Sequence, residues 1–283
     1  MPVVTMKELL EAGVHFGHQS KRWNPKMRKY IYAARNNVHV IDLNKSIPLI
    51  EIAYDFIKTT VEQNGALLFV GTKKQAQEAV EEEAKRCGMF YVNQRWLGGT
   101  LTNFKTVRKN VARLKEIEKW KMDGTYEKLP KKEIIMLERE YKKLLRGLDG
   151  IREMAKLPAA VFIIDTSKEQ TALKEANKLK IPVIAVVDTN SDPEPVDYPI
   201  PGNDDAVRSI KLLTNIVANA VITGREITKP VEERTEEIAV PLEAAEEAEV
   251  AEVAEAIIKE EKIEDLGLIK MAPEEGEEKR TGF

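Results

Sequence analysis

The sequence predicts an α/β protein built around a parallel sheet, and three observations lead to this fold class. Short, fully apolar runs occur at 66–70, 159–164 and 182–187, as expected for strands covered on both faces. Segments between them carry apolar residues at three-four spacing, which predicts helices. The two kinds of segment alternate along the chain, which is typical of a parallel sheet with crossover helices.

The first part of the chain contains two predicted helices. Thr5 and Glu8 form a capping box that starts a short helix, which Gly13 ends. We expect Ser46 to cap the second helix, because Pro48 then falls in its first turn.

A hairpin and further sheet elements follow from turn residues and short apolar runs. Two alternating strands flank Arg35–Asn37 and predict a hairpin. Phe90–Val92 is predicted as a strand, and prolines make Tyr198–Pro201 an edge strand. The remaining predicted helices begin at Gly71, at Ser167 and after Gly202–Asp205, where Asp204 and Asp205 suit the helix dipole.

Residues 104–156 interrupt this α/β pattern. Two segments with apolar residues at three-four spacing are separated by a break at Asp123–Thr125, which predicts an antiparallel coiled-coil hairpin. The insertion holds 16 basic and 9 acidic residues. We therefore expect a projecting basic arm that the sheet core does not need, with 1–103 and 157–228 forming the α/β domain.

Charge divides the chain into two unlike parts. Residues 231–283 hold 18 acidic and 6 basic residues, a net charge of −12, and the preceding residues hold 29 acidic and 38 basic residues, a net charge of +9. The basic part predicts a polyanionic partner. Residues 229–283 have few large apolar residues and are predicted to form a disordered acidic tail.

Basic and aromatic residues are concentrated in the segment 21–35. It carries six basic residues and no acidic one, interleaved with Trp23, Tyr30 and Tyr32. Densely packed like charges repel unless a polyanion lies among them, and RNA offers both phosphates and stackable bases. The segment therefore favours nucleic-acid binding over a solvated basic loop.

The stretch 89–104 turns from a strand into a polar loop hinged by Gly98 and Gly99. Asn93, Gln94 and Arg95 supply amide and guanidinium donors beside Trp96. A binding loop and a tight turn with Trp96 as a core ring are both consistent with this spacing. Asn103 is expected to cap the helix that follows.

Other features exclude several classes of protein. The single cysteine, Cys87, excludes a disulfide framework and a thiolate zinc cluster. The start of the chain lacks a basic-then-apolar leader, and no stretch approaches the ~20 apolar residues of a membrane span. We expect a cytoplasmic protein with no membrane partner.

Six separate blocks, taken together and in order, resemble bacterial ribosomal protein S2 of the small subunit over about residues 3–226. They are His15–His18, Trp23–Met27, Val70–Lys73, Arg95–Asn103, Ile181–Val183 with Val187–Asn190, and Ile200–Ala206. The resemblance implies a flavodoxin-like three-layer α/β domain with a protruding helical hairpin. It also implies binding to small-subunit ribosomal RNA between head and body, neighbouring small-subunit proteins, and docking of ribosomal protein S1. It implies nothing about the tail.

RNA contacts are expected from the basic loops, from stacking aromatics and from amide or guanidinium groups. The predicted contact residues are Lys21, Arg22, Trp23, Asn24, Lys26, Arg28, Lys29, Arg95, Trp96, Thr102, Asn103, Lys105 and Arg108.

Two other hypotheses come from different classes of protein. An enzyme would use Asp165, Asp188 and Asp192, with Gly71–Lys73 holding a phosphate, but the sequence lacks a dinucleotide fingerprint and a nucleophile elbow. We therefore expect no enzymatic activity and no cofactor. A minor hypothesis is a structural zinc ion held by His18, Asp188 and Asp205, whose ligand types suit zinc.

Overall fold

The computed structural model describes residues 3–124, 126 and 129–228. The predicted acidic tail, 229–283, lies outside these residues. None of the helices in the described part of the chain has the length and apolar character needed to cross a membrane.

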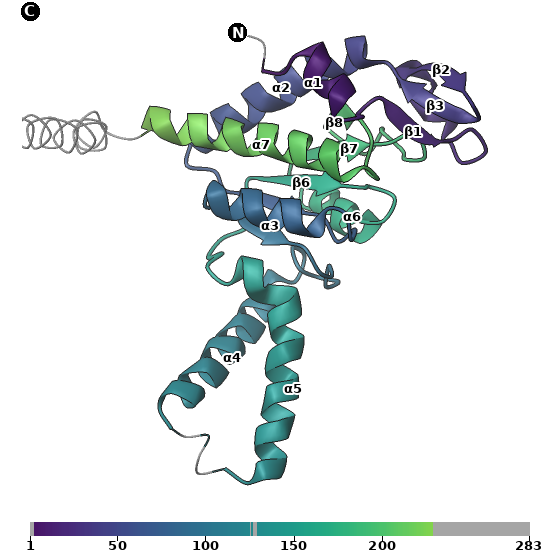
Figure 1. Ribbon diagram of the computed structural model, residues 1–283. Coiled ribbons are helices and arrows are strands. Elements are labelled where there is room, and N and C mark those ends of the chain that lie inside the picture. The colour runs from purple at the N-terminus through teal and green to yellow at the C-terminus, as the bar shows by residue number, and fades with distance from the viewer. Residues whose placement is uncertain (1–2, 125, 127–128, 229–283) are drawn as a thin grey trace, which may run out of the picture. The chain divides into compact units, whose positions relative to one another are not determined.

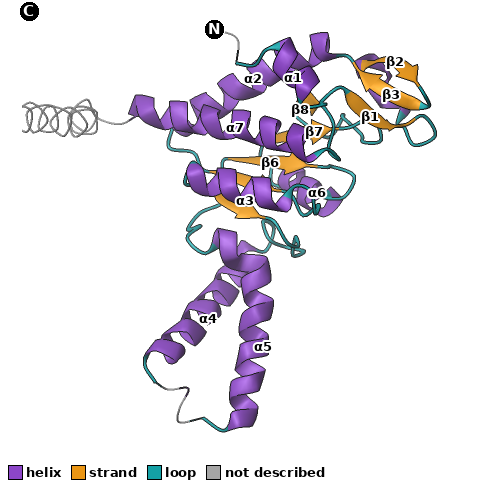
Figure 2. Ribbon diagram, in the orientation of Figure 1, coloured by secondary structure: helices purple, strands orange, loops and turns teal. Residues whose placement is uncertain are grey.

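A five-stranded parallel sheet forms the centre of the fold (Figures 1 and 2). Its strands are β4 (Leu67–Val70), β5 (Phe90–Val92), β6 (Ala160–Ile164), β7 (Val183–Val187) and β8 (Tyr198–Pro201). The spatial order β5-β4-β6-β7-β8 is the flavodoxin-like order in which the first strand lies between the second and the third. The predicted α/β class is confirmed, and β8 is an edge strand as its prolines predicted.

Side chains from every central strand alternate between two buried clusters. In β4, Leu67 and Phe69 enter one cluster, and Leu68 and Val70 enter the other. All four are at most 1% exposed, which explains why the strand reads as a continuous apolar run. Each such side chain stabilises the fold by roughly 1.5–3 kcal/mol relative to exposure.

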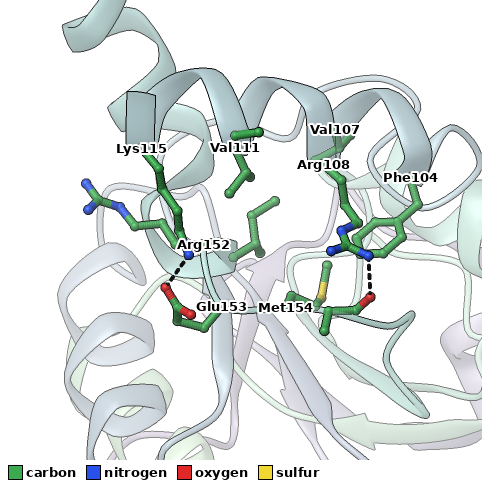
Figure 3. A pocket seen from close by; sticks show the side chains of 11 residues that line it. Phe104, Val107, Arg108, Val111, Lys115, Arg152, Glu153 and Met154 are labelled. Carbon is green, nitrogen blue, oxygen red and sulfur yellow. Dashed lines mark hydrogen bonds and ion pairs between the residues drawn. The ribbon is translucent and has the colours of Figure 1, made fainter. Parts of the chain in front are cut away.

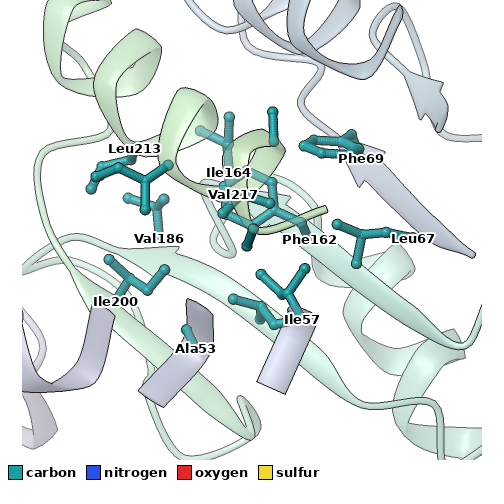
Figure 4. Close-up of a cluster of buried hydrophobic side chains, with 14 of the residues drawn as sticks. Ala53, Ile57, Leu67, Phe69, Phe162, Ile164, Val186, Ile200, Leu213 and Val217 are labelled. Atoms are coloured by element: carbon teal, nitrogen blue, oxygen red, sulfur yellow. The ribbon is translucent and has the colours of Figure 1, made fainter. Parts of the chain in front are cut away.

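Helices cover the two faces of the sheet unequally. The first cluster is closed by α2 (Leu43–Glu62), α3 (Gln77–Arg86) and α7 (Val207–Thr228), and α1 (Met6–Glu11) contributes Leu9. Figure 4 shows side chains of α2 and α7 packed against those of the strands. The second cluster, which we call the α6-side cluster, is closed by α6 (Gln170–Lys178) together with loops and the base of the insertion. The result is a three-layer arrangement with one irregular layer.

A smaller antiparallel sheet lies beside α1. Its strands are β1 (Phe16–Gln19), β2 (Ile31–Arg35) and β3 (Val38–Ile41), in the order β1-β3-β2. The predicted β2–β3 hairpin is confirmed, with Asn36 and Asn37 at φ of 49° and 61° as a tight hairpin turn requires. The sequence of β1, Phe-Gly-His-Gln, lacks the β-branched residues that are typical of strands.

The predicted starts of several helices were wrong. α2 begins at Leu43, and the Asp42 side chain accepts the Asn44 N–H at 3.2 Å, so Asp42 and not Ser46 is its cap. Ser46 lies inside the helix and donates to the Pro201 carbonyl at 2.8 Å. α3 and α6 begin later than predicted, at Gln77 and Gln170, whereas α7 begins at Val207, after the segment 202–205 as predicted. Helix boundaries are the part of a sequence-based assignment that local patterns determine least.

The insertion contains the two predicted helices, α4 (Phe104–Met122) and α5 (Lys131–Leu148), joined to the body by the short helix η3 (Asp149–Ile151) (Figure 1). Arg113 pairs with Glu140 at 3.2 Å, and the Tyr141 hydroxyl donates to Glu118 at 3.1 Å, so the two helices contact each other. Their coiled-coil geometry stays a prediction.

The base of the insertion belongs to the core. Val107, Leu148, Ile151 and Met154 are at most 6% exposed and lie in the cluster that also contains the strands and α6. A Cβ on Gly150 would lie 2.2 Å from the Tyr91 carbonyl oxygen, so the backbone of the junction packs directly on β5. The expectation that the sheet core does not need this segment was wrong for its base.

Candidate nucleic-acid interface

The basic segment is held in place by one buried side chain. Asn24 caps the short helix η1 (Pro25–Tyr30) by accepting the Lys26 N–H at 3.0 Å, and Met27 is fully buried in the α6-side cluster. This anchor leaves Lys21, Arg22, Arg28 and Lys29 exposed.

The cations of this segment are not equivalent. Lys26 pairs with Asp192 at 2.8 Å and also with Glu194, and the hydrogen bonds that it donates to these two carboxylates raise the pKa of Lys26. Among the described residues, Lys21, Arg22 and Arg28 form no ion pair, and Trp23 is 37% exposed. Lys21, Arg22 and Arg28 are therefore the cations most available to phosphates.

A buried carboxylate organises the loop after β5. Glu175 of α6 is 7% exposed and accepts hydrogen bonds from Trp96 Nε1 at 3.1 Å and from the Gly99 N–H at 2.7 Å. Its second oxygen accepts from the Leu101 N–H at 3.0 Å and from both the N–H and the hydroxyl of Thr102 at 3.1 Å. Burial opposes the charge of Glu175, but these donors outweigh burial and lower its pKa.

This arrangement changes the interpretation of two predicted contact residues. Trp96 is 8% exposed and its only polar atom is bound by Glu175, so the ring packs in the core, which was the alternative left open from the sequence. Thr102 is exposed, but its hydroxyl also holds the loop. Glu175 itself carried no sequence signal, because a glutamate in an amphipathic helix ordinarily faces water.

Besides Thr102, the exposed polar side chains of the loop are Gln94, Arg95 and Asn103. Arg95 has no hydrogen-bond or ion-pair partner in the described part of the chain. Asn103 occupies the N-cap position of α4 as predicted, but its side chain accepts from the Thr106 hydroxyl at 2.8 Å and not from a backbone N–H.

The base of the arm contains a small cavity of about 220 Å³. Figure 3 shows Val107 and Val111 of α4 facing Met154 across it. Two polar contacts close its sides: Arg108 donates to the Ala155 carbonyl at 3.3 Å, and Lys115 pairs with Glu153 at 2.8 Å. Part of the donor set of Arg108 is therefore already used within the protein.

Lysine and aspartate side chains form a cluster at the carboxyl edge of the main sheet. Lys73 Nζ lies 2.7 Å from Asp204, 2.6 Å from Asp205 and 3.4 Å from Asp165. Burial opposes the ammonium charge, but the two nearest carboxylates outweigh burial and raise the pKa of Lys73. Lys73 is thus held by carboxylates, which argues against the phosphate-binding role that the enzyme hypothesis required.

The interpretation of Asp204 and Asp205 as first-turn acids was also wrong. α7 begins only at Val207, and Asn203 supplies the capping interaction by accepting the N–H groups of Asp205 at 2.8 Å and Ala206 at 3.2 Å. The two aspartates instead pair with Lys73.

The three candidate zinc ligands from the sequence are brought together by the fold. His18 Nδ1 lies 3.0 Å from Asp188 Oδ2, and His18 Nε2 lies 3.3 Å from Asp205 Oδ2. The hydrogen bond that the His18 imidazole donates to Asp188 raises the pKa of His18.

Asp204 adds a fourth candidate ligand, which the sequence analysis missed. It is fully buried and its Oδ2 has no hydrogen-bond partner in the part of the chain that the structure describes. Burial and the charges of Asp188 and Asp165 raise its pKa to about 7. One ligand atom from each of His18, Asp188 and Asp204 lies within 4.8 Å of the others.

The three segments that carry the predicted RNA contacts are anchored on the same side of the main sheet. Met27 beneath the basic segment, Trp96 beneath the loop, and Val107 at the base of the arm all enter the α6-side cluster. The exposed residues next to them are therefore presented around the α6 layer.

The fold and these basic elements define an α/β protein whose parallel sheet carries an inserted pair of helices. The family model described as Ribosomal protein S2 matches residues 9–224. The chain belongs to the ribosomal protein S2 family and is a structural constituent of the small ribosomal subunit.

Proposed function

We propose that this chain binds small-subunit ribosomal RNA, between the head and the body of the subunit, through the α6 side of its sheet. The observation that carries the proposal is the group of exposed cations Lys21, Arg22 and Arg28 beside the exposed ring of Trp23. Phosphates pair with such cations, and unstacked bases stack on such rings. Arg95, Asn103 and Lys105 extend the surface, and Trp96 and Thr102 act by holding the loop.

The basic segment is tested by the salt dependence of RNA binding. Replacing Lys21, Arg22, Arg28 and Lys29 together by Ala should weaken binding and reduce the slope of log affinity against log salt by roughly 3–4, because four phosphate contacts are lost. A filter-binding titration with isolated small-subunit ribosomal RNA measures the slope. Replacing Lys7, Lys58, Lys85 and Lys211, which lie in α1, α2, α3 and α7 and not on the α6 side, is the charge-matched control, and equal slopes in the two variants would exclude the segment from the interface.

We further propose that ribosomal protein S1 docks on the small antiparallel sheet. An apolar cavity of about 720 Å³ lies there, lined by Phe16, Tyr32, Val38 and Val40 among others. Phe16 is 51% exposed and Tyr32 is 74% exposed. Aromatic side chains on a concave surface are typical anchors of protein interfaces.

This docking surface is tested with purified ribosomal protein S1. Replacing Phe16 and Tyr32 together by Ala should weaken S1 binding by about thirtyfold, the effect of losing one strong interface anchor. Surface plasmon resonance with the immobilised chain measures the affinity. Leu179→Ala, at another exposed apolar position, is the control, and an affinity of the double variant equal to that of the control would contradict the proposal.

A second proposed function is structural zinc binding by His18, Asp188 and Asp204. The observation that favours it is the buried Asp204 Oδ2, which has no protein partner among the described residues and faces ligand atoms of the correct type. Lys73 holds the other oxygen of Asp204, so the free oxygen remains available for a cation.

Calorimetric titration of the dialysed protein with zinc tests the site. The unchanged protein should bind one zinc ion and unfold at a higher temperature when zinc is present, because a ligand that binds only the folded state stabilises it. Asp204→Asn should lower zinc affinity by at least about tenfold. Asp192→Asn, outside the cluster, should not, and equal zinc binding by both variants would refute the site.

A further inference from the structure

A cavity of about 330 Å³ lies between α6 and the loops that follow β6 and β7. This is the edge at which parallel strands end, where open α/β sheets ordinarily bind their ligands. The cavity is also lined by Asn24 of the basic segment. The helix α6, which forms one wall of the cavity, also holds the loop 96–102 through Glu175.

One buried hydroxyl in the wall of this cavity lacks a partner. Thr166 follows β6, is 3% exposed, and its Oγ1 makes no hydrogen bond within the described ranges of the chain. Buried polar atoms in folded proteins nearly always have a partner. A ligand in the cavity would supply the missing interaction.

The helix contributes three further side chains of suitable chemistry. Gln170, Leu173 and Lys174 line the cavity from one face of α6, as their spacing of three and four residues requires. Gln170 and Lys174 are exposed, and neither side chain has a polar partner in the described structure. The face thus offers an amide, an apolar surface and a cation in sequence.

The combination matches the chemistry of a nucleotide. Proteins bind unstacked bases by apolar contact with the ring and by hydrogen bonds from amides and hydroxyls to the base edge. Leu173 and Pro195 supply apolar lining, Thr166 and Gln170 supply edge donors and acceptors, and Lys174 supplies a partner for the phosphate.

We propose that this cavity receives one unstacked nucleotide of the RNA that the basic segment binds. The proposal rests on the proposed RNA-binding function and assigns one of its specific contacts. The base lies against Leu173 and Pro195, and its edge is recognised by Thr166 and Gln170. Asn24 supplies a further donor to the base edge. Its Oδ1 accepts the Lys26 N–H, and its amide nitrogen has no partner among the described residues.

The test uses Thr166→Val and Gln170→Leu in the full chain, each alone and both combined in a double variant. Thr171→Val is the matched control, because Thr171 is exposed on α6 and does not line the cavity. Isolated small-subunit ribosomal RNA is the probe. The double variant should bind it about tenfold more weakly, the scale of one lost base contact, and its salt slope should not change, because no cation is removed.

A crosslinking measurement locates the contact directly. Ultraviolet irradiation of the RNA complex, followed by proteolysis and mass spectrometry, should place a nucleotide adduct on the peptide 169–174 in the unchanged protein and in Thr171→Val. The double variant should lose it. Gln170→Leu alone changes an exposed residue, so it keeps the test valid if Thr166→Val impairs folding.

The outcomes distinguish a failure of the cavity proposal from a failure of the proposed RNA-binding function. RNA affinity of the double variant equal to that of Thr171→Val, with no adduct on 169–174, overturns the cavity while RNA binding by the unchanged protein stands. Failure of the unchanged protein to retain the RNA overturns the proposed function itself. Binding of a nucleoside 5′-monophosphate that the double variant abolishes, at unchanged RNA affinity, overturns the RNA assignment in favour of a free nucleotide.

Discussion

Replacing Glu175 by Gln should destabilise the protein by about 3 kcal/mol, because a buried carboxylate that accepts several hydrogen bonds loses its charge and half of its acceptor capacity. Five hydrogen bonds from the loop 96–102 reach the two oxygens of Glu175. A Gln amide presents an NH₂ group to one of the two sets of donors, in either orientation. Chemical denaturation followed by circular dichroism measures the change.

The pH dependence of this effect has a defined sign. The pKa of Glu175 is lowered in the folded state from its ordinary value of 4.5. The carboxylate therefore contributes its full stability above that value and loses it as the pH falls through the lower folded pKa. The difference in unfolding free energy between the unchanged protein and Glu175→Gln should narrow below about pH 4.5. Glu78→Gln, at an exposed position, should show no comparable difference at any pH.

The same substitution should reduce RNA binding if the loop is part of the interface. Arg95 and Asn103 are positioned by backbone that Glu175 holds, so their geometry depends on that carboxylate. If Glu175→Gln and Glu78→Gln have equal stabilities at neutral pH, the hydrogen bonds to Glu175 do not organise this loop in solution.

Truncating Leu148 to Ala should destabilise the protein by about 2–5 kcal/mol, because it leaves a cavity where α5 meets the sheet. Leu148 is fully buried and lies in the same cluster as β4, β6 and β7. Ile135→Ala, farther along the same helix and 51% exposed, should change stability by less than about 0.5 kcal/mol. Equal effects of the two substitutions would show that the base of the arm does not belong to the core.

Two replacements of different length distinguish the contribution of the base of the arm to stability from that of its outer part. Replacing residues 115–141 by a Gly-Ser linker should leave a cooperatively unfolding domain, because the buried residues Val107, Leu148, Ile151 and Met154 remain. Replacing 105–155 removes all four and should abolish cooperative unfolding. Hydrogen exchange of the β4 and β6 amides distinguishes the two results.

Sequence patterns correctly predicted the elements that are specified by interactions between residues close together in the chain. The apolar runs of β4, β6 and β7 report burial on both faces, and Asn36-Asn37 reports a backbone with positive φ. The capping box of Thr5 and Glu8 is present with both of its hydrogen bonds. Each of these signals involves residues within a few positions of one another, so the sequence alone contains them.

The candidate site could be predicted only in part, because its charges are paired across long distances in the chain. Lys26 and Lys73 look alike as basic residues after a turn, yet Lys26 meets Asp192 and Glu194, and Lys73 meets Asp204 and Asp205. Trp23 and Trp96 look alike as rings in polar loops, yet one is 37% exposed and the other 8%. Neither composition nor spacing distinguishes the members of these pairs.

Local patterns were sufficient to predict the α/β class, the parallel strands, the inserted pair of helices and the basic segment, and six motifs indicated the family. The folded structure was needed to show that Glu175 binds the loop of Trp96, that Asp204 lies beside His18 and Asp188, and that Thr166 lines a cavity with Asn24. The reason is that backbone propensity and burial act on neighbouring residues, while buried polar groups are satisfied by partners that only the folded chain brings within hydrogen-bonding distance.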